Sequence, residues 1–97
     1  MKALAELFQV VEAETPYGGR AATYEPVGYA WLKTGARRRR ERSGPDGAQT
    51  VETVVAETRS DPRLSMGRVL RFGGADWRIA GADSVGGRAI LTLERMR

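Results

Sequence analysis

The chain has 97 residues and a mass of 10.6 kDa, enough for one domain with one hydrophobic core. It contains neither cysteine nor histidine, which excludes disulfides, thiolate or imidazole metal sites, Cys nucleophiles and Ser-His-Asp triads. Its apolar runs are too short to span a bilayer, and acids interrupt the N-terminal stretch where a signal peptide stays apolar. We expect a soluble intracellular domain, residues 1–97, that is not an enzyme and uses no cofactor, metal or membrane.

The basic character of the chain is local. The net charge is +4, from 16 bases and 12 acids. Five of these bases and one acid lie in the run Arg37-Arg38-Arg39-Arg40-Glu41-Arg42, so the rest of the chain carries 11 bases and 11 acids. A nucleic-acid-binding face spread over the domain would show scattered bases with interleaved aromatic residues. The sequence therefore disfavours such a face.

The first third of the chain predicts two strands joined by a turn. Residues 7–11 are β-branched or aromatic enough to form a strand, although residues 3–8 could equally start a short helix. Residues 15–19, TPYGG, form a strong turn signal because proline presets φ and glycine permits positive φ. Residues 24–33 follow as a strand that ends in the alternating sequence YAWLK.

Residues 34–49, TGARRRRERSGPDGAQ, contain no large apolar side chain and are bounded by glycines. This composition predicts a long polar loop that projects from the domain, and such loops are usually functional or disordered. Arginine binds phosphates and carboxylates, so the loop could contact nucleic acid or an acidic partner. The alternative is a solvated loop, but the concentration of charge favours a segment that becomes ordered in an assembly. The candidate site residues are Arg37, Arg38, Arg39, Arg40 and Arg42.

The remainder of the chain predicts four more strands, at residues 50–59, 68–72, 77–80 and 89–94. A turn with at most one helical turn begins at residues 60–62, and glycine-rich reversals separate the last three strands. About six short strands with such turns indicate an all-β fold, a small antiparallel β-barrel or sandwich with the long polar loop between strands.

Aromatic and branched residues at alternate strand positions are candidates for the core or for a subunit interface. The aromatic members could instead stack on nucleic-acid bases, but core or interface positions are the commoner use of this pattern. The predicted core or interface residues are Tyr29, Trp31, Phe72, Trp77, Ile79, Leu91 and Leu93.

The glycine pairs and two aspartates of the last third do not indicate a phosphate-binding or metal-binding site. The glycine pairs Gly73-Gly74 and Gly86-Gly87 do not lead into a helix with a Lys-Ser/Thr pair, so they predict hairpin turns and not phosphate loops. Asp76 and Asp83 have no neighbours at metal-ligand spacing, and aspartate is ordinary in turns.

The order of these features resembles the head-tail joining proteins (head-closure, stopper or head-completion proteins) of long-tailed bacteriophages and phage-like gene transfer agents. The resemblance rests on the turn at residues 17–20, the strand V-x-Y-A-W-L-K at residues 27–33, and M-x-R-V-L-R-F-x-G-x-x-W-R-I-A-G-A at residues 66–82, followed by L-T-L-E at residues 91–94. It covers nearly the whole chain through degenerate motifs. Trp77 stands where the family more often has tyrosine.

The resemblance implies a virion structural protein that assembles in the bacterial cytoplasm into a dodecameric ring at the head-tail interface. The portal or adaptor ring would lie above it and the tail terminator or tail tube below. The ring would extend the channel through which packaged double-stranded DNA leaves. In this family the long loop closes the channel, so residues 34–49 would be the gate, with their arginines facing the DNA or pairing with acids of neighbouring copies.

Two other functions remain open at this point. The chain could take a neighbouring connector role, as an adaptor or tail terminator. It could also be a small β-barrel nucleic-acid-binding module, with the arginines on phosphates and Trp31 or Tyr29 stacked on bases. The charge-neutral remainder of the chain disfavours this second alternative.

Overall fold

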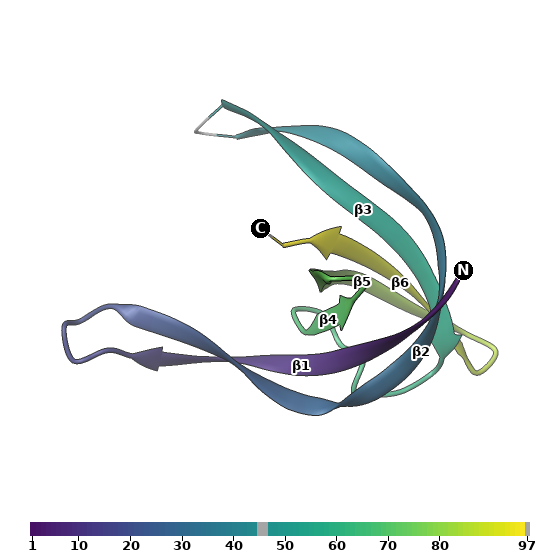
Figure 1. The fold of residues 1–97 in the computed structure, drawn as a ribbon, viewed down its shortest axis with the longest axis horizontal. Coiled ribbons are helices and arrows are strands. Elements are labelled where there is room, and N and C mark those ends of the chain that lie inside the picture. The colour runs from purple at the N-terminus through teal and green to yellow at the C-terminus, as the bar shows by residue number, and fades with distance from the viewer. Residues whose placement is uncertain (45–46, 97) are drawn as a thin grey trace.

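The structure, a computed structural model, describes residues 1–44 and 47–96 and consists of six antiparallel strands. Their order in the sheet is β1-β2-β3-β6-β5-β4, and β4 pairs again with β1, so the sheet closes in a ring (Figure 1). The prediction of an all-β antiparallel fold with six strands is confirmed. The strands are β1 (Lys2–Glu14), β2 (Arg20–Gly44), β3 (Gly47–Arg59), β4 (Val69–Phe72), β5 (Ala75–Val85) and β6 (Arg88–Arg95).

The 25-residue strand β2 is shared between two long hairpins. Its first half pairs with β1, from Glu14↔Arg20 to Lys2↔Lys33, and its second half pairs with β3. Both hairpins extend beyond the ring, and in Figure 1 the C-terminal end lies between them. We call residues 9–25 the acidic hairpin and residues 37–54 the arginine hairpin. Within the described residues, no helix is long and apolar enough to cross a membrane.

The prediction of a long polar loop at residues 34–49 is wrong for the part that the structure describes. Strand β2 continues through the arginines to Gly44, and β3 begins at Gly47, while residues 45–46 lie outside the described residues. A two-stranded ribbon that meets solvent on both faces needs no apolar side chains, because its backbone hydrogen bonds are made across the pair. Polarity at these positions therefore reports solvent on both faces of a ribbon.

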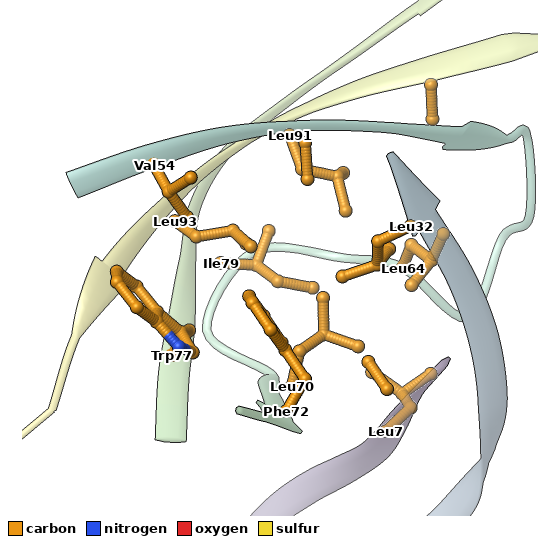
Figure 2. Close-up of a cluster of buried hydrophobic side chains, with 13 residues drawn as sticks. Leu7, Leu32, Val54, Leu64, Leu70, Phe72, Trp77, Ile79, Leu91 and Leu93 are labelled. Carbon is orange, nitrogen blue, oxygen red and sulfur yellow. The ribbon is translucent and has the colours of Figure 1, made fainter. Parts of the chain in front are cut away.

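The core lies inside the ring, where alternate side chains of the strands converge (Figure 2). Trp77 is fully buried and stacks on Phe72, with 5.6 Å between the ring centroids and 13° between the ring planes. Five of the seven predicted core or interface residues lie here, namely Phe72, Trp77, Ile79, Leu91 and Leu93. Tyr29 and Trp31 do not, because their side chains are 60% and 66% exposed. The largest fully buried side chains are Trp77, Leu7, Leu32, Leu70, Ile79, Leu91, Leu93 and Val69.

Candidate functional site: the arginine hairpin

The arginine hairpin is a two-stranded ribbon with a different set of arginines on each face. Directly paired residues of an antiparallel ladder share a face. Arg37 and Arg39 therefore share the face of Val54 and Glu52, which are buried against the ring. The other face carries Arg38 opposite Thr53, Arg40 opposite Val51 and Arg42 opposite Gln49.

On the inner face, Arg37 joins a charged cluster at the edge of the core. Glu52 is only 8% exposed, and its carboxylate lies 3.0 Å from Nη1 of Arg95 and 3.6 Å from Nη1 of Arg37. The hydrogen bond from Arg95 is the main cause of a lowered pKa at Glu52, and the charges of Arg95, Arg37 and Arg39 act in the same direction. The Arg37 guanidinium also lies over the Trp77 ring. Arg37 is thus bound within the protomer.

On the outer face, Arg42 is also paired within the chain. Its Nη2 donates to Glu94 at 3.0 Å, and Arg78 donates to the other oxygen of the same carboxylate at 2.7 Å. The hydrogen bond from Arg42, with that from Arg78, lowers the pKa of Glu94. Two of the five arginines therefore have acidic partners inside the protomer.

The other three arginines of the run, Arg38, Arg39 and Arg40, are available to an outside partner. Within residues 1–44 and 47–96, no carboxylate lies in ion-pair distance of Arg38, Arg39 or Arg40. Arg38 and Arg40 lie on the outer face two residues apart, which separates them by about 6.6–6.8 Å along the strand. Arginine forks onto phosphate oxygens, so this face can bind an extended anionic backbone.

The described residues offer no group of three acidic side chains that could hold a metal ion. Asp76 and Asp83, which the sequence placed in turns, both lie in strand β5, and Asp76 accepts a hydrogen bond from Nε of Arg71 at 2.7 Å. The arrangement that the structure brings together is suited to binding anions and to protein contacts.

Tyr29 and Trp31 lie far from the arginines along β2, on the outer face of the sheet. Trp31 pairs with Leu4 and Tyr29 with Glu6, so Leu4 joins the two aromatic residues on one exposed face. A surface pocket of about 550 Å³ opens beside them and reaches the buried Leu64. Tyr29 and Trp31 are not members of the buried core cluster. The interface role of these two residues, and the alternative that they stack on bases, both stay predictions.

Sequence reasoning missed the acidic partners Glu52 and Glu94, the cation Arg95 and the pocket. The signal for Glu52 was present in the sequence. Glu52 is the one acid in the otherwise apolar and threonine-rich run TVETVVA, and its pairing with Arg39 puts it on the face that carries the buried Val54. The pocket had no such signal, because its lining comes from segments far apart in the chain.

Among the comparisons with known proteins, a solved structure matches this chain in fold. Neither a protein-family model nor a curated protein sequence matches the chain. The chain is similar in structure to a chain in a solved structure described as "Virion of native gene transfer agent (GTA) particle". The TM-score is 0.70 at 20% sequence identity, over 96% of this chain and 93% of that chain. The likeness extends over nearly the whole of both chains, so a fold of this kind occurs in that virion structure.

Proposed function

We propose that the protein is a structural virion protein, a subunit of the head-closure ring in the head-tail connector of a phage-like particle. The observation that carries the proposal is the likeness in fold to a chain of a gene transfer agent virion, which extends over nearly all of both chains. The motifs at residues 27–33 and 66–82 support the same family from the sequence. The role is architectural, with no catalytic step.

In this proposal the arginine hairpin is the gate of the DNA exit channel. It is a strand-paired ribbon that extends beyond the ring (Figure 1). Arg38 and Arg40 face the DNA, and Arg37 anchors the base of the hairpin at the core. Repeated around a dodecameric ring, these arginines produce a strongly positive constriction that binds the phosphate backbone of packaged double-stranded DNA.

The neighbours in this proposal are further copies in the ring, the portal or adaptor ring above, and the tail terminator or tail tube below. Ring contacts of this kind are heterologous and close on themselves. A chain of this size gains stability from neighbouring copies that cover its exposed surface.

Electron microscopy of particles from cells that lack the gene tests the role. The expected result is DNA-filled or leaking heads without tails, beside free tails. Complementation with the intact gene restores tailed particles. Normal tailed particles after deletion would overturn the role and direct the work to DNA binding by the isolated chain. If electron microscopy of intact tailed particles located the chain in the adaptor ring or the tail-terminator ring, the chain would have that neighbouring role instead.

A hairpin variant tests the gate separately. Complementation with Arg38→Ala/Arg40→Ala is expected to give tailed particles that leak DNA. The matched control is Arg38→Lys/Arg40→Lys, which keeps both charges at the same positions and retains DNA. Equal DNA retention by the alanine and lysine variants would remove these arginines from the gating role.

A further inference from the structure

The tip of the acidic hairpin presents an exposed tyrosine on an ordered turn. Tyr17 is 98% exposed at the centre of residues 15–19. Thr15 holds this turn closed through three hydrogen bonds. Its N–H donates to the Gly19 carbonyl at 2.7 Å, its carbonyl accepts from Gly18 at 3.1 Å, and its hydroxyl accepts from the N–H of Gly19 at 3.0 Å. The turn is therefore a preformed knob with an aromatic side chain at its end.

The hairpin that carries this knob is negatively charged. Residues 9–25 contain three acids, Glu12, Glu14 and Glu25, and one base, Arg20. The closest contact between these charges is the exposed pair of Arg20 and Glu12 at 3.5 Å. Glu14 and Glu25 have no ion pair within the described residues. The hairpin that presents the knob therefore carries a net negative charge, which favours a positively charged partner.

A pocket with an excess of positive charge lies where the start of β1 pairs with the middle of β2, at the end of the β1–β2 ladder opposite to the Tyr17 turn. Trp31, Tyr29 and Leu64 supply its apolar wall, and four cations line it. Its two acids are already bound, Glu57 by Arg88 at 3.1 Å and Asp61 by Arg63 at 2.7 Å. Lys2, Lys33 and Arg59, which also line the pocket, have no ion pair in the described parts of the chain. The pocket therefore combines an aromatic wall with an excess of positive charge.

The knob of a molecule lies far from its own pocket. Trp31 pairs with Leu4 near the start of β1, whereas the turn follows Glu14 at the end of this strand. Ten residues of extended chain separate Leu4 from Glu14, a distance of about 33 Å. Figure 1 shows the N-terminus and the tip of the β1–β2 hairpin at opposite ends of the molecule. The knob can reach such a pocket only on another copy.

We propose that the Tyr17 turn of one copy inserts into the Trp31 pocket of the next copy, with Glu12 and Glu14 against Lys2, Lys33 and Arg59. The contact is head-to-tail, so every copy contributes one knob and one pocket, as a closed ring requires. Aromatic packing supplies the attraction, and the opposite charges fix the orientation. This inference rests on the proposed function only in taking the assembly to be the connector ring.

Cysteine cross-linking tests the contact directly, because the chain contains no cysteine of its own. The double variant Pro16→Cys/Lys33→Cys, which keeps Tyr17 and places a thiol on the exposed residue beside it, is oxidised at high protein concentration and low salt. It is expected to give a ladder of dimers, trimers and longer species. The matched control, Pro16→Cys/Gln49→Cys, keeps Tyr17 on the knob and moves the second thiol to the exposed edge of the arginine hairpin. Docked thiols meet at an effective concentration on the order of mM, so the pocket pair should cross-link at least about tenfold faster. Equal rates for the two pairs, in the purified chain and in particles, would overturn the contact.

Charge reversal gives an independent measurement. Lys33→Glu in the pocket and Glu14→Lys on the hairpin should each slow cross-linking between Pro16→Cys and Arg59→Cys, and the combined reversal should restore the rate. If both single reversals leave the rate unchanged, the proposed contact is wrong.

The outcome for the contact is separable from that for the connector role. Particles that contain the chain but show no cross-link between Pro16→Cys and Lys33→Cys would overturn the contact and leave the role standing. Cross-linking of the purified chain, together with normal tailed particles after gene deletion, would keep the contact and overturn the role.

Discussion

The guanidinium of Arg37 lies over the indole of Trp77, with 5.3 Å between its central carbon and the ring centroid. The same side chain is 3.6 Å from the carboxylate of Glu52. Trp77 is fully buried, so the first arginine of the hairpin covers the edge of the hydrophobic core. The arginine run therefore has two roles: Arg37 fixes the base of the hairpin, and Arg38 to Arg40 carry charge that the protomer leaves available.

Replacement of Arg37 should destabilise the protein, whereas replacement of Arg40 should not. A cation–π contact over tryptophan contributes about 0.5–1 kcal/mol, which corresponds to a fall in melting temperature of about 2–8 °C for a domain of this size. Thermal unfolding followed by circular dichroism of Arg37→Ala and Arg40→Ala measures both. The two variants lose the same charge, so an equal fall would mean that net charge and not the Trp77 contact controls stability.

The stability of the protein should decrease in acid, because two carboxylates are held ionised by arginines in the folded state. The pKa values of Glu52 and Glu94 are lowered in the folded state from their ordinary value of 4.5. Their ionised forms therefore contribute stability that is fully present above the unfolded-state pKa and is lost as the pH falls through the lower folded-state pKa. The urea concentration at the unfolding midpoint, measured from pH 7 to pH 3, should begin to decrease once the pH is below about 4.5.

The Glu52→Gln variant is the control for this pH dependence. Its unfolding midpoint should be lower than that of the unaltered chain at neutral pH, and the gap should narrow as the pH falls. A gap that stays constant with pH would show that ionisation of Glu52 does not stabilise the fold.

The strands of the last third were predictable because one of their faces is buried. Trp77 and Ile79, and likewise Leu91 and Leu93, alternate with exposed residues, and this alternation appears directly in the sequence. Residues 38–44 and 47–50 of the arginine hairpin were not predictable in this way, because they are exposed on both faces of the ribbon. Tyr29 and Trp31 show a third case. Their spacing correctly places them on one face of a strand, but spacing does not say whether that face points inward.

A core substitution should separate the two faces of β6. Leu91 is fully buried and its neighbour Ile90 is 41% exposed. Leu91→Ala should lower the free energy of unfolding by about 2–5 kcal/mol, because it removes buried methyl groups and leaves a cavity. Ile90→Ala removes a similar volume from the surface and should cost much less. Urea unfolding of the two variants measures both values, and similar losses would contradict the placement of the β6 faces.

Gly28 pairs with Leu7 at the register shift between Leu7 and Phe8. Its φ of +156° lies in a region that side chains disfavour, and a Cβ there would collide with the Arg63 guanidinium, which donates to the Val27 carbonyl at 3.4 Å. Gly28→Ala should therefore lower the free energy of unfolding by at least about 1 kcal/mol.

A double-mutant cycle with Arg63→Ala separates the two causes of this loss. Backbone strain at Gly28 remains when Arg63 is shortened, whereas the collision disappears. Gly28→Ala should therefore destabilise the protein in both backgrounds, and less in the Arg63→Ala background. An equal loss in both would mean that Arg63 moves aside at no cost and that the backbone alone requires glycine. No loss in either background would show that the register shift tolerates a side chain, contrary to the backbone geometry of β2.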